Sequence, residues 1–127
     1  MTAKQPFYFH GADGSPLVFA GLWDLWLDAE GRPLCTCTII TTTANRTMAP
    51  VHHRMPVVLC RHHWDEWLAP VPLPPGRLAQ LLVPASEDLL VCYPVSTAVN
   101  NSQRNGADLI EPVDAPEVDF PTLPMRF

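Results

Sequence analysis

The chain has 127 residues, of which 47% are hydrophobic and 17% charged, and its formal net charge is −5. This length suits one domain with a buried core, and the apolar content excludes an intrinsically disordered chain. Proline accounts for 15 residues, which argues against an all-helical bundle and favours short strands joined by rigid turns.

No segment has the pattern of a secretory signal, and no apolar run approaches the roughly 18 residues that a membrane-spanning helix requires. We therefore expect a cytoplasmic protein with no membrane partner. Because the cytoplasm keeps thiols reduced, the four cysteines are expected to be free.

Five segments predict β-strands, because they are rich in β-branched, aromatic or apolar residues and are bounded by turn-forming residues. They are residues 6–10, 17–23, 36–43, 54–59 and 89–94. The turn signal at 11–16 predicts that the first two segments form a hairpin, and a second turn is expected at 28–33. The short stretch 44–51 has room for one helical turn.

Two short helices are expected in the second half of the chain. Trp64, Trp67 and Leu68 follow the i, i+3, i+4 spacing of an amphipathic helix over 61–68. A proline pair precedes leucines at helical spacing over 75–82, which is typical of a helix with proline in its first turn.

These elements predict an α+β fold that is mostly antiparallel β, with two or three short helices. Residues 1–113 are expected to form the folded part. Residues 114–127 are acidic and interrupted by prolines, so we expect a mobile tail.

Several cysteines and tryptophans are candidates for the core. Cys35 and Cys37 lie two residues apart on an expected strand, so both side chains share one face, where they are interpreted as small core residues. The spacing of the tryptophans favours core packing over stacking on unpaired bases. They are Trp23, Trp26, Trp64 and Trp67.

The charges are unevenly distributed. Between Glu30 and Asp65 there is no carboxylate, whereas this window holds four arginines and four of the five histidines. A locally basic middle and an acidic tail are compatible with binding to a polyanion, although chance in a chain with few charges is the alternative.

His52 and Arg54, in the run HHRMP, lie between two strand-like segments. Imidazole exchanges protons near neutral pH, and guanidinium forks onto phosphate or carboxylate. The pair therefore suits an anionic ligand that undergoes proton transfer. The alternatives are a structural histidine in a turn, and an arginine that is solvated or paired with Asp24 or Asp65.

A zinc site is one possible interpretation of the middle of the chain, where thiolate and imidazole side chains cluster. The C-x-C and H-H spacings lack the usual zinc-ligand patterns, so we predict no metal and no cofactor. The residues concerned are Cys35, Cys37, His52, His53, Cys60, His62 and His63.

Four segments, in order, resemble the SOS-response-associated peptidase (SRAP) family, the abasic-site-processing proteins. They are KQPFYFHGADGSPLVFAGLWDLW, TIITTTANRTMAPVHHRMPVVL, WDEWL and YPVSTAVNNSQRNGADLIEPV, and they cover most of residues 4–113. Four linked motifs make the resemblance specific.

The resemblance implies a mostly β fold, a partly open barrel or sheet, that binds single-stranded DNA and repairs abasic sites. Family members form a covalent thiazolidine between an N-terminal cysteine and the abasic aldehyde, and the same cysteine is linked to self-processing. By this resemblance His52 is the catalytic histidine, Arg54 lies against the DNA backbone, and Thr41 lies by the nucleotide.

The chain resembles only the C-terminal half of the family's domain. The family begins Met-Cys-Gly-Arg, whereas this chain begins MTAK, and the family's catalytic asparagine and glutamate segments have no counterpart. Asp24 does not inherit the glutamate's role, and His53 stands where the family often has aspartate. We therefore expect no covalent trapping of abasic-site DNA by this chain alone.

Two main functional hypotheses follow, besides a third, a metal-stabilised binding protein, which the ligand spacing argues against. The first is a DNA-repair protein of the SRAP type. The second is a non-catalytic remnant that acts as a fold or interaction module with weak binding to single-stranded DNA. Because the family's sheet is completed by N-terminal strands, we expect exposed edges here and a partner that covers them. That partner is a separate N-terminal half or a second copy of the chain.

Overall fold

The computed structural model describes residues 4–114, and the elements occur in the following order. They are β1 (Phe7–Gly11), β2 (Gly21–Leu27), β3 (Pro33–Ile39), β4 (Thr41–Thr43), β5 (Arg54–Pro56), η1 (Arg61–His63), α1 (Trp64–Leu68), α2 (Pro75–Leu81), β6 (Leu90–Pro94), η2 (Thr97–Asn100) and η3 (Ala107–Ile110), where η marks a 3-10 helix. The strands form three antiparallel pairs, β1–β6, β2–β3 and β4–β5. The predicted α+β class is confirmed, and no closed barrel occurs within residues 4–114.

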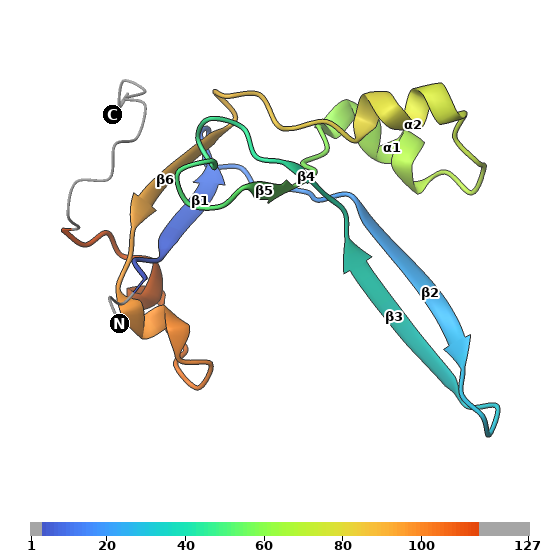
Figure 1. Ribbon diagram of the computed structural model, residues 1–127, viewed down its shortest axis with the longest axis horizontal. Helices are drawn as coiled ribbons and strands as arrows, with labels where there is room; N and C mark the ends of the chain where they lie inside the picture. Colours follow the sequence, from blue (N-terminus) through green and yellow to red (C-terminus); the bar gives the residue numbers. More distant parts are fainter. Residues whose placement is uncertain (1–3, 115–127) are drawn as a thin grey trace.

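The predicted hairpin of segments 6–10 and 17–23 is wrong. β1 pairs with the distant β6, where Tyr8 lies opposite Tyr93 with 5.5 Å between ring centroids. Segment 17–23 divides instead, because Phe19 bridges to Val58 and β2 begins two residues later. Figure 1 shows β2 running to the far end of the molecule from β1. A turn reverses the direction of the chain but does not by itself pair the segments on its two sides. Cross-strand contacts between aromatic side chains favour the pairing of β1 with β6.

Three chain segments meet at one buried junction. Ala20 donates its backbone N–H to Val57, Val57 donates to Ile40, and Ile40 donates to Ala20, each over 2.9 Å. Ala20 and Val57 are fully buried. The closed triangle satisfies backbone groups that would otherwise be costly to bury.

The core consists of two small clusters, and the first of them includes the junction residues. The first contains Ala20, Val57 and Leu59, packed against Ile40, Trp64, Trp67 and Leu82. The second contains Met55, Ala85 and Leu90, packed against Leu17, Met48, Val58 and Leu89. Segment 55–59 contributes to both clusters, so the strand predicted at 54–59 is the centre of the fold even though regular pairing ends at Pro56.

Both predicted helices are confirmed, at 61–68 as η1 followed by α1 and at 75–82 as α2. Pro75 opens α2, where a missing N–H costs nothing. Trp64 and Trp67 pack against the first core cluster as predicted. A bidentate ion pair joins the helices, with Arg77 Nε 2.5 Å from Glu66 Oε1 and Nη2 2.6 Å from Oε2.

The core prediction is wrong for Cys35, Cys37, Trp23 and Trp26, which are all exposed. The two cysteines do share one face of β3, as expected, since they lie opposite Leu25 and Trp23. Their exposure follows from the hairpin's surroundings: β2 and β3 extend away from the body, and no described segment covers them (Figure 1).

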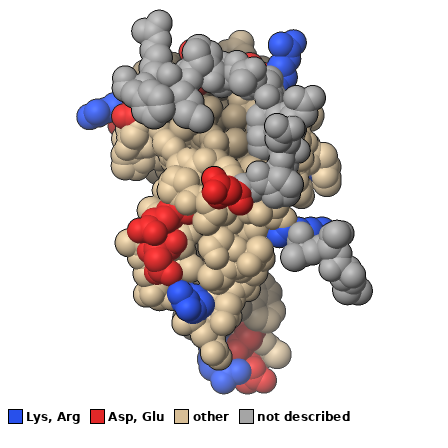
Figure 2. Space-filling view, turned by 90° about the vertical axis from the view of Figure 1, so that its left-hand side faces the viewer, with Lys and Arg blue, Asp and Glu red and all other residues tan. Residues whose placement is uncertain are grey.

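The charged side chains do not form one continuous patch on the end of the molecule seen in Figure 2. Acidic and basic groups occur there in separate places on a mostly uncharged surface. Among residues 4–114, no helix is long and apolar enough to cross a membrane. The predicted mobile tail lies almost wholly outside the described residues, so the structure does not bear on it.

The Glu66–Arg77 pair makes the stability of the chain depend on pH. The Arg77 guanidinium, by hydrogen bonding first and charge second, holds the pKa of the Glu66 carboxyl below its usual range. A depressed folded-state pKa contributes stability above the unfolded carboxyl pKa, and that stability is lost as pH falls through the folded value. We expect Glu66→Gln to unfold at lower urea concentration than wild type at pH 7, with the difference shrinking toward pH 3.

The matched control is Asp65→Asn, which removes the neighbouring carboxylate on α1 that forms no ion pair within the described residues. Urea melts of the three proteins at several pH values provide the measurement. An equal loss in both variants at pH 7, or a Glu66→Gln deficit that persists in acid, would contradict the role assigned to this pair.

Candidate functional site

The β4–β5 pairing brings Thr41 and Arg54 into contact although they are far apart in the sequence. Arg54 Nη2 donates to the Thr41 carbonyl oxygen over 2.7 Å and to Thr41 Oγ1 over 2.8 Å. Arg54 Nε lies 3.3 Å from the same hydroxyl. The threonine therefore fixes one edge of the guanidinium plane on an otherwise exposed surface.

The other edge of this guanidinium is exposed and has no partner among residues 4–114. Nη1 of Arg54 donates to no residue within 4–114, and no carboxylate in that range pairs with it. The alternative partner Asp24 instead accepts from the backbone N–H of Leu25 over 2.8 Å. An exposed, pre-oriented guanidinium of this kind suits a phosphate or carboxylate oxygen.

His52 is held at the same place through the backbone of Arg54. Its Nδ1 lies 3.0 Å from the Arg54 backbone N–H nitrogen and 2.9 Å from the Arg54 carbonyl oxygen. The Nε2–H tautomer accepts from the first at Nδ1, whereas the Nδ1–H tautomer donates to the second. In the Nδ1–H tautomer the ring keeps the Arg54 carbonyl oxygen as its partner whether it is neutral or protonated, and Nε2 is then the atom that can exchange a proton.

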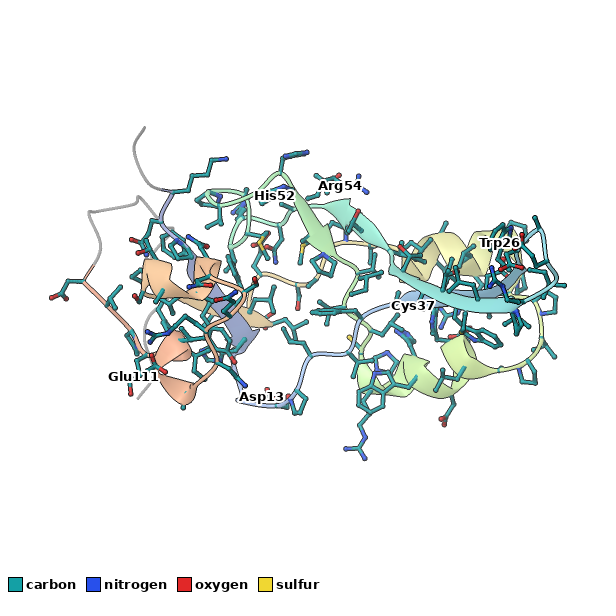
Figure 3. All side chains as sticks on the ribbon, turned by 90° about the horizontal axis from the view of Figure 1, so that it is seen from below. Asp13, Trp26, Cys37, His52, Arg54 and Glu111 are labelled. Atoms are coloured by element: carbon teal, nitrogen blue, oxygen red, sulfur yellow. The ribbon has the colours of Figure 1, made fainter. Side chains whose placement is uncertain are left out.

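The three residues identified from the sequence occupy one exposed area. His52 and Arg54 lie side by side on one edge of the molecule, whereas Asp13 lies on the opposite edge (Figure 3). His53 stacks on His52 with 4.5 Å between ring centroids, which adds a second imidazole to the area. The site thus places two imidazoles beside one guanidinium.

Asn45 anchors the loop that leads to His52, a role that the sequence analysis missed. It is buried, and its Nδ2 donates to the Ala85 carbonyl oxygen over 3.1 Å while its Oδ1 accepts from the Met48 N–H over 3.0 Å. The Met48 carbonyl oxygen in turn accepts from the His52 N–H over 3.0 Å. The sequence offers only an asparagine between a strand-like run and a turn, because its burial and its contact with Ala85 depend on the tertiary structure.

A second tether joins the same loop to the segment before β6. The Glu87 carboxylate accepts from the Arg46 backbone N–H over 2.9 Å, and the buried Thr47 hydroxyl donates to the Glu87 carbonyl oxygen over 3.2 Å. The loop is therefore fixed at several points before it reaches the imidazole.

Neither a thiol nor a carboxylate completes the site within the described residues. The polar contacts of His52 and Arg54 are those given above, and none involves a cysteine, aspartate or glutamate. Burial raises the pKa of the Cys92 thiol, which makes it a poor nucleophile. No group of three metal-ligating side chains is arranged for a metal ion within residues 4–114.

The site is an open surface and not an enclosed pocket. Two shallow depressions lie elsewhere, one of about 330 Å³ beside β1 and one of about 200 Å³ beside Asp13 and Asp88. Neither contains Thr41, His52 or Arg54. An open site of this type is accessible to a large ligand.

Comparison with known proteins gives a consistent result. The sequence model of the SOS response associated peptidase (SRAP) family matches residues 1–102. The abasic site processing protein YoaM of Bacillus subtilis is 45% identical over 108 residues, which are 85% of this chain and 48% of that protein. The abasic site processing protein YedK of Escherichia coli is 33% identical over 119 residues, covering 87% of this chain and 50% of YedK.

A solved structure from Bacteroides thetaiotaomicron superposes with a TM-score of 0.77 at 29% identity, and the match covers 88% of this chain and 50% of that chain. The chain thus spans about half the length of the relatives that it matches.

The anchoring role of Asn45 predicts a loss of stability in Asn45→Ala. The change leaves the Ala85 carbonyl and the Met48 N–H without their partners in a buried place, which costs about 1–3 kcal/mol in the free energy of unfolding. Arg46→Ala is the control: this neighbouring residue is exposed and bonds to Glu87 only through its backbone, so its variant should remain within about 0.5 kcal/mol of wild type. Chemical denaturation measures both, and equal stability of Asn45→Ala and wild type would contradict the assignment.

Proposed function

Because the chain belongs to the SOS response associated peptidase (SRAP) family, we propose that it binds single-stranded DNA at an abasic site and contributes one side of the centre that processes the lesion. Residues 1–113 are then the C-terminal portion of a SRAP domain, consistent with a match to about half of each relative. The contact between Thr41 and Arg54, with His52 beside it, is the observation that carries the proposal.

Arg54 binds a phosphate of the DNA strand in this proposal. Its plane is already oriented by Thr41, so little side-chain freedom is lost when an oxygen binds the outward edge. Phosphate contacts of this kind position a strand without reading its sequence.

His52 serves as the acid and base at the abasic aldehyde. An amine that adds to the aldehyde carbon forms a carbinolamine, which loses its oxygen as water when an acid supplies a proton. A thiol then adds to the resulting imine carbon and closes the thiazolidine ring. With Nδ1–H donating to the Arg54 carbonyl oxygen in both the neutral and the protonated ring, Nε2 can give the first proton and recover one without the ring reorienting.

The amine and thiol of this reaction come from outside residues 4–114 in the proposal, since no thiol contacts His52 there. The same observation favours the second candidate, a non-catalytic interaction module that retains weak binding to single-stranded DNA. The two differ in lesion dependence: a module that binds only the backbone has equal affinity for intact and abasic strands.

Arg54→Ala is expected to weaken binding of the chain to single-stranded DNA and to reduce the dependence of affinity on salt. Each phosphate contact on a single strand contributes about −0.7 to the slope of log K against log salt concentration, because a bound counterion is released. Fluorescence anisotropy of a labelled oligonucleotide at several salt concentrations measures the slope.

Arg104→Ala is the matched control, since it removes the same charge from an arginine paired with Asp108 away from the site. We expect its slope to equal that of wild type. An unchanged slope in Arg54→Ala, or an equal change in both variants, would show that Arg54 does not contact the backbone.

His52→Asn is expected to lower the preference for abasic over intact strands while leaving the affinity for intact strands unchanged. Asparagine can keep a polar atom near the position of Nδ1, and so the contact with the Arg54 backbone, but it has nothing in place of Nε2. Anisotropy competition between the two oligonucleotides measures the preference. If wild type itself shows no preference, the interaction-module hypothesis is the better one.

A further inference from the structure

The β2–β3 hairpin is exposed along its whole length. Every residue of both strands is exposed, and Trp23 retains 75% of its accessible surface. Figure 1 shows the hairpin extending from the central junction beyond the rest of the fold. A two-stranded ribbon with no layer on either face is marginal by itself.

The strand register separates the hairpin into two different faces, because side chains alternate along each strand. One face mixes apolar and polar residues, namely Leu22, Asp24, Trp26, Leu34, Thr36 and Thr38. The other, which we call the apolar hairpin face, has no charged and no hydroxyl-bearing residue. It consists of Trp23, Leu25, Leu27, Pro33, Cys35, Cys37 and Ile39.

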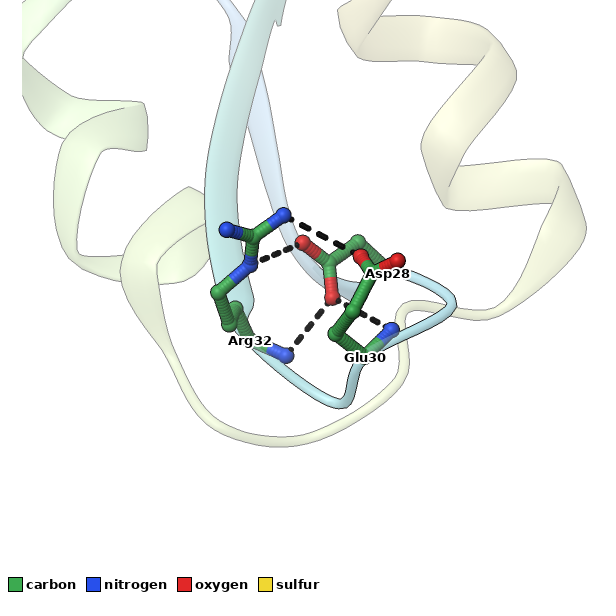
Figure 4. A network of polar contacts seen from close by, with 3 residues as sticks. All are labelled: Asp28, Glu30 and Arg32. Atoms are coloured by element: carbon green, nitrogen blue, oxygen red, sulfur yellow. Dashed lines mark hydrogen bonds and ion pairs between the residues drawn. The ribbon is translucent and has the colours of Figure 1, made fainter.

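Contacts within the tip of the hairpin stabilise its turn, and these contacts do not depend on a partner. At its tip the Asp28 carboxylate accepts from the backbone N–H groups of Glu30 and Arg32 over 3.0 and 2.8 Å (Figure 4). Arg32 Nε also lies 2.6 Å from Asp28 Oδ2. Gly31 supplies the positive φ of 78° that the turn requires. The Arg32 backbone contact, above all, lowers the pKa of Asp28, so the tip is ion-paired at neutral pH.

We propose that the apolar hairpin face binds a polypeptide equivalent to the half of a SRAP protein that this chain does not span. The solved relative with a TM-score of 0.77 has about half of its chain outside the match, so a polypeptide of that size accompanies this fold in the relative. A face without charge resembles a domain core cut in half more than a transient interface, which is more polar.

Strand pairing favours this occupant over a second copy of the chain. Within the described residues β2 and β3 pair only with each other, so each has one open backbone edge. Two identical hairpins stacked face to face would cover the apolar side chains but leave those edges unpaired. A segment that brings its own strands can cover the face and pair an edge together.

The test is co-expression of this full chain with the part of Bacillus subtilis YoaM that lies outside its match to the chain. We expect a soluble one-to-one complex by sedimentation, a blue shift in tryptophan emission as Trp23 leaves water, and slower hydrogen exchange at the amides of β2 and β3. The complex is formed without DNA. If no complex forms, the DNA-binding proposal is therefore unaffected. If Arg54→Ala leaves the salt dependence of DNA binding unchanged, the proposal for the apolar hairpin face is unaffected.

Two leucines on one strand provide a matched pair of variants. Leu25 lies on the apolar hairpin face and Leu22 on the opposite face, and both are 55% exposed in the chain alone. We expect Leu25→Asp to weaken the complex at least about tenfold, since burial of a leucine contributes more than one tenfold step in affinity. Leu22→Asp should leave the affinity unchanged.

Three results would overturn the proposal. They are the absence of a complex on co-expression, equal weakening by the two variants, and self-association of the chain alone that protects β2 and β3 from exchange. The last result would identify a second copy as the occupant.

Discussion

The triangle of backbone hydrogen bonds among Ala20, Ile40 and Val57 is the constraint on which the rest of the structure depends. Each of the three residues both donates and accepts, so no group at this buried point is left unpaired. The base of the β2–β3 hairpin, the start of β4 and the continuation of β5 all meet there. Ala20 is fully buried against Val57, and a larger side chain at this position would push the segments apart.

The junction also fixes the backbone of the candidate site. Arg54 is three residues before Val57 on the same segment, and Met55 between them is buried in the second core cluster. The buried residues hold the backbone, while the alternation of a strand turns Arg54 outward. Asn45 holds the other end of the loop in place, so the imidazole and the guanidinium are exposed while the backbone that carries them is fixed. Side chains on a fixed backbone lose little conformational entropy when they bind an anion.

One part of the fold buries its apolar side chains, and another part leaves them exposed. Around the junction, Trp64 and Trp67 of α1 and Leu82 at the end of α2 pack on the first core cluster. Leu89, just before β6, packs on the second. In the hairpin, apolar side chains as large as tryptophan and leucine remain in water.

The sequence by itself determined the features that depend on neighbouring residues. Periodicity and proline placement located α1 and α2, turn residues located the hairpin tip, and the HHRMP run identified His52 and Arg54. Only the tertiary structure decided that β1 pairs with β6, that Trp23 is exposed, and that Asn45 anchors the loop before His52. Each of these depends on residues far along the chain, or on surface that no described segment covers. Local spacing carries no information about which distant strand or carbonyl will be within reach, because that choice is made by the packing of the whole chain.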